Sequence, residues 1–249
     1  MPASVVNPTD YRVSWSALKD IMDWQQDEHV TLVGPTGAGK TTFTNAIIPE
    51  QPYNIFLGTK RVDETQDKLQ RMGFHTVSDP DVIHRDIARD WVVRPPFPAN
   101  AKDASGMIPV HRDVFRRTFM RAYNDTGWTV YVDEARYIYG KLGLADEGVL
   151  LYMQGRSQGN AVVTSTQRPR HIPLEAYDMA THLVFFKDRD ILNVRRVAEM
   201  AGMNPRRVVE LVKSLRNRPK SPHPEDHEFL YVNSNDNVMA ISHVEKEGD

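Results

Sequence analysis

The eight residues from Gly34 to Thr41, Gly-Pro-Thr-Gly-Ala-Gly-Lys-Thr, limit what this chain can fold into more than any other part of it. They match the pattern G-x-x-x-x-G-K-[ST], in which small residues let backbone N–H groups turn inward around phosphate oxygens. The short apolar run His29–Val33 leads into the pattern, and Thr41–Ile48, which ends before Pro49, is predicted to be a helix. A strand, a glycine-rich loop and a helix in this order predict a site for the phosphates of a nucleotide.

The residue types in this loop also predict individual contacts. Lys40 is expected to reach the β- and γ-phosphates, and the hydroxyl of Thr41 is expected to coordinate magnesium. The predicted cofactors are therefore ATP and Mg2+, and the predicted nucleotide-binding residues are Gly34, Pro35, Thr36, Gly37, Ala38, Gly39, Lys40, Thr41 and Thr42. The alternative is a chance match to the pattern, or a loop of this form that does not bind nucleotide.

An acidic pair at a strand end is the second predicted part of the site. The buried-type strand Thr129–Val132 runs directly into Asp133 and Glu134. Beside a phosphate loop, this arrangement predicts that Asp133 holds magnesium through water and that Glu134 orients or deprotonates the attacking water. Without that loop, the two carboxylates would be interpreted as surface residues at a strand end.

The same residues bear on the class of reaction. A small-molecule kinase is disfavoured, because a water activated by Glu134 would compete with the acceptor substrate. A GTPase needs an Asn/Thr-Lys-x-Asp motif to recognise guanine, and Thr59-Lys60-Arg61-Val62 has Val62 in the place of the required Asp. This near match also precedes the acidic pair in the chain. We therefore expect ATP hydrolysis.

A polar residue after a neighbouring strand completes the predicted catalytic set. The expected buried strand Ala161–Thr166 ends in Gln167-Arg168-Pro169. The amide of Gln167 can both donate and accept hydrogen bonds, so it suits a position that touches the γ-phosphate and the water. The alternative is a simple polar cap between strand and loop.

Apolar runs of strand length alternate with segments of helical periodicity along most of the chain. This alternation predicts an α/β fold of the P-loop NTPase (ASCE/RecA-like) type, a mainly parallel sheet with helices on both faces, plus a small C-terminal β-hairpin. The expected strands are His29–Val33, Asn54–Leu57, Thr129–Val132, Ala161–Thr166 and Leu183–Phe186, and the expected helices include Val62–Met72, Val110–Tyr123, Val194–Met200 and Pro205–Leu215. Residues Val82–Ala88 and Asp90–Val93 are not assigned.

Three segments are predicted. Residues 1–24 form an N-terminal segment with a short amphipathic helix, and we interpret its apolar face as core packing, with a nucleobase shelf or a subunit contact as alternatives. That face is formed by Trp15, Leu18, Ile21, Met22 and Trp24. Residues 25–218 form the ATPase domain. Residues 219–249 form a C-terminal loop and a hairpin of Phe229–Val232 and Val238–His243.

Composition and charge set outer limits on the function. With 249 residues, 40% of them hydrophobic and 26% charged, the chain can form one large domain, or one domain with a small appendage. It has no cysteine, which excludes disulfides and thiolate–zinc sites. The net charge of −2 gives no bulk attraction to nucleic acid, so such a contact needs a local basic patch. Because no signal layout and no apolar run of roughly 20 residues is present, we expect a soluble cytosolic protein.

The order of the motifs resembles one group of ATPases. After the phosphate loop come Asp133-Glu134-Ala135, Gly155-Arg156-x-x-Gly159, a buried strand, Thr166-Gln167-Arg168-Pro169, and then an apolar strand and a helix before Ala201-Gly202. This order, over roughly residues 30 to 202, resembles the FtsK/HerA superfamily of DNA-pumping ATPases. A chain of this length, without long added domains, is most similar to the branch that packages the genomes of tailless, membrane-containing viruses.

The resemblance implies partners as well as chemistry. It implies a homo-oligomeric ring, commonly a hexamer, that threads double-stranded DNA without reading its sequence and docks to a capsid or membrane-vertex protein. It also implies an arginine that acts across the subunit interface on the transferring phosphoryl group. Arg156 is expected in this role by its place in the motif, with Arg136, Arg168 and Arg170 as rivals. An ordinary helix-end cation is the alternative for Arg156. The expected location is the host cytoplasm or the virion.

Several basic segments are candidates for contacts with DNA phosphates. One is the late basic stretch with Arg195, Arg196, Arg206, Arg207, Lys213, Arg216, Arg218 and Lys220, and another is the helix with Arg112, Arg116, Arg117 and Arg121. Two predicted loops, Arg94–Met107 with Lys102 and Tyr137–Glu147 with Lys141, are candidates for facing a pore. Solvated helix faces, subunit contacts and plain surface loops are the alternatives.

The resulting hypothesis is an ATP-driven double-stranded DNA translocase that packages a viral genome. A related motor for plasmid transfer or virion extrusion, an ATP-gated assembly switch without DNA pumping, and a small-molecule kinase remain as alternatives.

Overall fold

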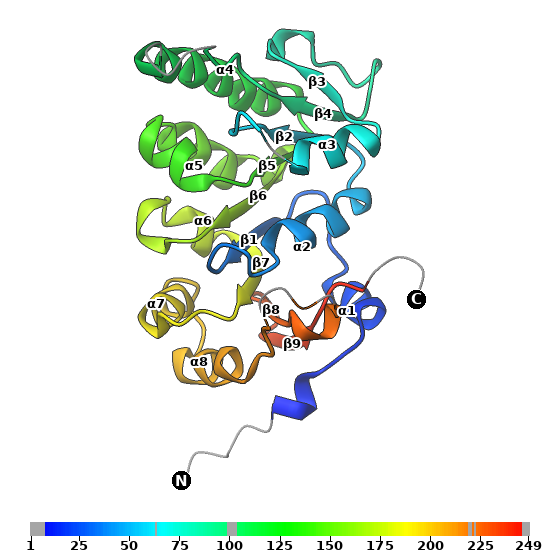
Figure 1. The fold of residues 1–249 in the computed structure, drawn as a ribbon, viewed down its shortest axis with the longest axis vertical. Coiled ribbons are helices and arrows are strands. Elements are labelled where there is room, and N and C mark those ends of the chain that lie inside the picture. The colour runs from blue at the N-terminus through cyan, green and yellow to red at the C-terminus, as the bar shows by residue number, and fades with distance from the viewer. Residues whose placement is uncertain (1–7, 63, 99–103, 219–220, 222, 246–249) are drawn as a thin grey trace.

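The structure is a computed structural model in which residues 8–62, 64–98, 104–218, 221 and 223–245 are described. Its described part contains one nine-stranded sheet in the order β3-β4-β2-β5-β6-β1-β7-β8-β9 (Figure 1). The strands are β1 (His29–Val33), β2 (Asn54–Leu57), β3 (His75–Val77), β4 (Asp90–Val93), β5 (Thr129–Val132), β6 (Ala161–Thr166), β7 (Ala180–Phe186), β8 (Phe229–Asn233) and β9 (Val238–Ser242). All pairings among β1 to β7 are parallel, and β8 and β9 pair antiparallel.

Helices cover both faces of this sheet (Figure 1). One face carries α1 (Trp15–Met22), α2 (Lys40–Ile47) and α3 (Glu64–Arg71), and the other carries α4 (Ala104–Asp125), α5 (Ala145–Gln154), α6 (Glu175–Asp178), α7 (Ile191–Met200) and α8 (Pro205–Ser214). Short turns are η1 (Pro8–Tyr11), η2 (Ile48–Glu50), η3 (Pro80–Val82), η6 (Arg156–Gln158), η7 (Pro169–His171), η8 (Pro224–Asp226) and the π-helix η5 (Arg136–Lys141). The predicted α/β fold with a mainly parallel sheet is confirmed.

The central strands are buried along their whole length because both of their faces are covered. Every residue of β1, β2, β5, β6 and β7 is buried. Apolar side chains of α1, α2 and α3 meet one face, those of α4 and α5 meet the other, and α7 and α8 complete the second layer beside β7. Continuous burial explains why these strands were predictable as short apolar runs.

The structure corrects several sequence-based expectations. β3 has only three residues, none of them buried, so periodicity does not reveal it, and β4 is a parallel strand in a stretch left unassigned. Helix α4 begins at Ala104, before the expected Val110, and includes Pro109. Because proline is typical of a helix start, it concealed the first turn of α4. The candidate loop Arg94–Met107 is therefore helical at its end, and its Lys102 lies outside the described residues.

The second candidate loop, Tyr137–Glu147, was predicted wrongly. It consists of the π-helix η5 and the start of α5. Ile138, Tyr139 and Leu142 are buried in the core beside α4, with exposed fractions of 0%, 3% and 0%. Packing of these side chains orders a segment whose glycines and charges resemble those of a flexible loop.

The two ends of the described chain lie together against the sheet. Ser14 caps α1 by accepting from the Ala17 N–H, and Trp15 packs edge-to-face against Phe43 and Phe229. Leu18 and Met22 of α1 are buried in the core and Trp15 and Trp24 pack against it, as interpreted, but Ile21 of the predicted face is 37% exposed. The predicted hairpin forms from β8 and β9, and it continues the main sheet beside β7. The division at residues 24 and 218 stays a prediction.

None of the helices in the described segments combines the length and the apolar character needed to cross a membrane.

Candidate functional site

Strand order and register bring the predicted site residues to one edge of the sheet. β1 lies between β6 and β7, and β5 lies on the other side of β6. Val33 of β1 is level with Thr166 of β6, and Val132 of β5 is level with Thr164. The phosphate loop, the acidic pair and Gln167 therefore follow the carboxyl ends of adjacent parallel strands, where ligands of open α/β sheets bind.

The phosphate loop has the backbone that its glycines allow. The φ angle is 75° at Gly37 and 108° at Gly39, in a region that residues with a Cβ rarely adopt. Gly34 is required for a different reason, because a Cβ there would lie 2.6 Å from the Cβ of Phe186. The Gly34 N–H also donates to the Thr166 carbonyl at 3.1 Å. The start of the loop is thus held between β6 and β7.

Lys40 lies over the loop and not in solvent. Its exposed fraction is 8%, and its Nζ donates to the carbonyls of Gly34 and Pro35 at 2.8 Å each. Burial lowers the pKa of Lys40, and the nearby carboxylates of Asp133 and Glu134 partly offset that effect. The side chain is positioned to exchange neutral carbonyl oxygens for phosphate oxygens.

A cavity of about 230 Å3 joins the loop to the acidic pair. It is lined by Thr36, Gly37, Gly39, Lys40, Thr41, Thr42, Lys60, Asp133, Glu134, Ser165 and Gln167. The structure therefore brings together the predicted phosphate-binding, metal-binding and catalytic residues, except for Arg156. Of the predicted nucleotide-binding residues, Gly34, Pro35 and Ala38 lie outside the cavity lining.

The residues of this cavity fit a magnesium-bound nucleotide. Mg2+ favours oxygen ligands and is commonly held by one or two carboxylates together with substrate phosphates. The Asp133 carboxylate and the Thr41 hydroxyl offer such oxygens. The Ser165 hydroxyl is buried in the cavity wall and has no hydrogen-bond partner within the described segments. A buried polar atom without a protein partner is expected where a ligand supplies one.

Apart from Ser165, Lys60 is the lining residue of this cavity that the motifs did not identify. Its Nζ lies 3.8 Å from Asp133 Oδ2 and 3.7 Å from Glu134 Oε2. Lys60 follows β2, and β2 pairs with β5, so the register of these strands places it beside the acids. The sequence indicates only that Lys60 comes shortly after an expected strand. Only the sheet order shows that this strand is next to the acidic one.

Arg156 is not brought to the phosphate loop of its own chain. It lies in η6, before β6 begins, and its Nε is 3.8 Å from Asp27 Oδ2, just before β1 begins. Both residues are therefore at the amino edge of the parallel strands, whereas the nucleotide cavity is at the carboxyl edge. The rival arginines lie at the carboxyl edge: Arg136 in η5 follows β5, and Arg168 and Arg170 follow β6.

A second cavity of about 450 Å3 adjoins the first, because Glu134 lines both. Its other lining residues are Arg136, Tyr137, Gly140, Lys141 and His171. The segments η5 and η7 pack against each other here. The wall contains the cations Arg136 and Lys141, and the side chains of these two residues and of His171 are exposed.

Many of the basic residues proposed for DNA contact are already paired with acids. On α4, Arg117 binds Asp79, Asp81 and Asp113, and Arg121 binds Asp125. Similar pairs join Arg116 to Asp113, Arg195 to Glu199, Arg216 to Glu228 and Arg218 to Asp226. No acid lies within 4 Å of Arg136, Lys141, Arg168, Arg170, Arg196, Arg206 or Lys213 in the part of the chain that the structure describes. Lys220 lies outside that part.

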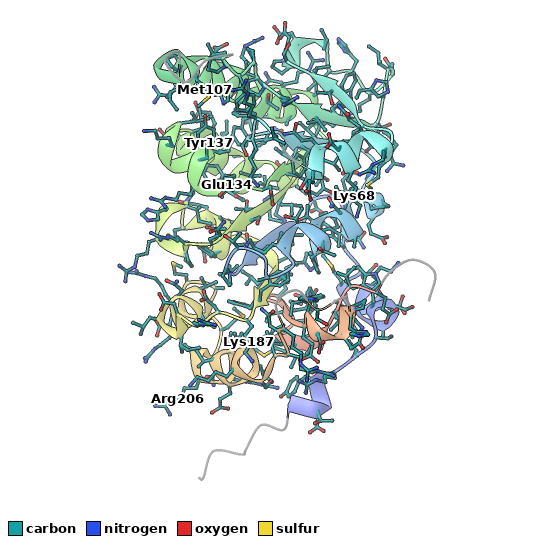
Figure 2. All side chains as sticks on the ribbon, in the orientation of Figure 1. Lys68, Met107, Glu134, Tyr137, Lys187 and Arg206 are labelled. Atoms are coloured by element: carbon teal, nitrogen blue, oxygen red, sulfur yellow. The ribbon has the colours of Figure 1, made fainter. Side chains whose placement is uncertain are left out.

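The unpaired cations fall into two groups that lie apart. Arg206 on α8 is near one end of the long axis of the molecule and Met107 on α4 is near the other, with Glu134 and Tyr137 between them (Figure 2). Arg136 and Lys141 thus belong to the edge that holds the nucleotide cavity, and Arg206 belongs to a distant helix.

Comparison with known proteins shows a shared fold at low sequence identity. No protein-family model and no curated protein matches the sequence. The genome packaging NTPase B204 from Sulfolobus turreted icosahedral virus 2, in complex with sulfate, is 18% identical, with a TM-score of 0.61 over 89% of this chain and 98% of that chain. That NTPase is also solved with AMPPCP.

Two further solved structures have the same fold. The DNA-packaging ATPase B204 from Sulfolobus Turreted Icosahedral Virus is 16% identical, with a TM-score of 0.57 over 90% of this chain and 100% of that chain. The cytoplasmic domain of EssC is 13% identical, with a TM-score of 0.50 over 91% of this chain and 42% of that chain. These structures confirm the fold that the order of motifs predicts.

Proposed function

We propose that this chain is an ATP-hydrolysing motor that translocates double-stranded DNA, and that it drives a viral genome into a capsid. The observation that carries the proposal is the cavity in which the phosphate loop, Asp133, Glu134 and Gln167 meet. The motif resemblance and the similarity in fold to B204, a genome packaging NTPase that is solved with an ATP analogue, support the choice of nucleotide and cargo.

Each cavity residue has a chemical role in this proposal. The Nζ of Lys40 binds phosphate oxygens, and the Thr41 hydroxyl and the Asp133 carboxylate hold Mg2+, which when bound neutralises phosphate charge. The carboxylate of Glu134 orients or deprotonates the attacking water. The Gln167 amide donates to a phosphate oxygen and accepts from that water.

The arginine that completes the site comes from a neighbouring subunit of a homo-oligomeric ring, with a hexamer as the proposed assembly. Arg156 remains our candidate, and its place at the amino edge of the sheet means that it can serve only a neighbour's cavity. Arg136 is the alternative, because it lies at the carboxyl edge beside Glu134. Docking to a capsid or membrane-vertex protein, in the host cytoplasm or the virion, belongs to the same proposal.

Charge pairing narrows the surface that contacts DNA. The α4 arginines Arg116, Arg117 and Arg121 are largely neutralised by neighbouring acids. Arg136 and Lys141 of η5 are exposed, have no acid within 4 Å in the described segments, and line the same cavity as Glu134. We therefore propose that the cavity wall with Lys141 contacts phosphates, since a contact beside the catalytic carboxylate can couple DNA to hydrolysis.

The test is ATP hydrolysis with and without linear double-stranded DNA, on protein whose assembly mass has been measured. A translocase is expected to release phosphate faster when DNA is added. Unchanged hydrolysis with nucleotide-dependent assembly would indicate an assembly switch, and phosphate transfer to a metabolite would indicate a kinase. Packaging is separated from plasmid transfer and virion extrusion by adding empty capsids and measuring nuclease-resistant DNA.

A further inference from the structure

Lys60 stands between the two carboxylates of the site, and no motif assigns it a role. Its Nζ is 3.7 Å from a Glu134 carboxylate oxygen and 3.8 Å from an Asp133 carboxylate oxygen. These distances allow charge attraction but are longer than direct hydrogen bonds. Lys60 lines the nucleotide cavity together with Lys40 and Thr41. Its ammonium therefore acts on both acids from inside the cavity.

The backbone that carries Lys60 is fixed by its surroundings. The Gly58 N–H donates to the Val93 carbonyl, at the end of β4, at 2.9 Å. A Cβ on Gly58 would lie 2.8 Å from Nε2 of Gln66, and the same Nε2 donates to the Lys60 carbonyl at 3.5 Å. Gln66 is a buried residue of α3. The side chain of Lys60 thus extends toward the acids from an anchored position.

The carboxylate of Glu134 is only partly buried, and the side chain of Lys60 beside it is 46% exposed. The Glu134 side chain is 33% exposed, so packing alone does not hold the carboxylate in one direction. Among the described residues, Lys60 is the cation that lies within 4 Å of the Glu134 carboxylate. Adjacent carboxylates repel each other, and one ammonium near both offsets that repulsion and favours one arrangement. Correct placement of a base is worth a large part of its effect on the rate.

We propose that Lys60 is a positioning residue that directs the carboxylate of Glu134 toward the attacking water. The inference rests on the proposed function, since Lys60 has no such task where ATP is not hydrolysed. Nucleotide binding has other determinants, namely the phosphate loop with Lys40 and Thr41. Loss of Lys60 must therefore slow hydrolysis while binding is kept.

The experiment compares Lys60→Met with wild type and with Lys68→Met. Lys68 is an exposed residue of α3 and has no acid within 4 Å in the described segments. In Figure 2 it lies to the right of Glu134. Steady-state hydrolysis assays give kcat and KM. Titration with a fluorescent ATP analogue in the presence of EDTA gives the binding affinity in the absence of metal and of turnover. For Lys60→Met we expect kcat to fall roughly 10- to 100-fold, with KM and analogue binding as in wild type. Lys68→Met is expected to match wild type in all three.

A conservative variant distinguishes a positioning role of the Lys60 charge from a purely structural role of its side chain. Lys60→Arg keeps a positive charge beside the acids and is expected to recover part of the lost kcat. A Lys60→Met protein with wild-type kcat, or one that loses kcat and analogue binding equally, would overturn the inference. Glu134→Gln tests the proposed function in the same assay: if it hydrolyses ATP like wild type, the proposed function fails. If Glu134→Gln is inactive and Lys60→Met is not impaired, only the role of Lys60 fails.

Discussion

Replacing Gly34 by alanine tests whether β7 fixes the start of the phosphate loop. The new Cβ would lie 2.6 Å from the Cβ of Phe186 and 3.5 Å from its Cα. Non-bonded carbon atoms pack at about 3.5 to 4.0 Å, so the closest contact is too short by about 1 Å. The atom it meets is the first of the Phe186 side chain, which cannot rotate away. Either the loop or β7 must move, and overpacking of this kind costs about 1 to 3 kcal/mol.

Urea unfolding and binding of a fluorescent ATP analogue measure the two consequences. We expect Gly34→Ala to lower the free energy of unfolding by about 1 to 3 kcal/mol, and to weaken analogue binding because the loop is displaced. Gly106→Ala in α4 is the matched control, since a Cβ there meets nothing within 4 Å. That control should be stabilised by about 0.5 to 1 kcal/mol. A Gly34→Ala protein with wild-type stability and affinity would refute the close approach of Phe186 to the loop.

Three other predictions concern pH, the trans arginine and DNA. Burial lowers the pKa of His29 from 6.5 to about 4, so as pH falls between these values the unfolded chain binds a proton that the folded chain does not. The contribution of His29 to the free energy of unfolding should therefore fall by about 3 kcal/mol across that pH window. Urea titrations over the same window should show a smaller loss of stability for His29→Gln than for wild type. Mixtures of Arg156→Ala and Glu134→Gln subunits should recover phosphate release if Arg156 acts across the interface; absence of recovery in every mixture would assign the role elsewhere. Lys141→Ala should weaken DNA binding and reduce the slope of log affinity against log salt concentration by about 1. Arg116→Ala, which removes a charge already paired with an acid, should do neither. Equal effects of the two substitutions would reject the proposed DNA surface.

The parts of the site that depend on local residue types were predictable from the sequence. The order of glycines, Lys40 and Thr41 sets the phosphate loop, and in the presence of that loop a buried strand that ends in Asp133 and Glu134 is recognisable as its acidic partner. The adjacency of Gln167 to the loop followed from the expectation of parallel strands. Here the structure adds the register, with Val33 level with Thr166.

Two placements that depend on the wider strand order, those of Lys60 and Arg156, could not be predicted. Lys60 acts only because β2 lies beside β5 in the sheet, and no pattern in the chain shows that order. Arg156 follows a motif, but its place at the amino edge depends on the crossover from α5 to β6. The fold shows the same division: the fully buried strands were recognised, although β7 begins at Ala180 and not at the expected Leu183, and the short, unburied β3 was missed.

The proposed function depends on cleavage of ATP, bound on the phosphate loop, with the help of Glu134. Phosphate release and ATP-analogue binding, measured side by side for wild type and Glu134→Gln, test it most directly. We expect both proteins to bind the analogue equally well and hydrolysis by the variant to fall by about 100-fold or more. Release of phosphate by the variant at the wild-type rate would contradict the role of Glu134. Wild type that neither bound the analogue nor released phosphate in any assembly state would contradict the proposed function.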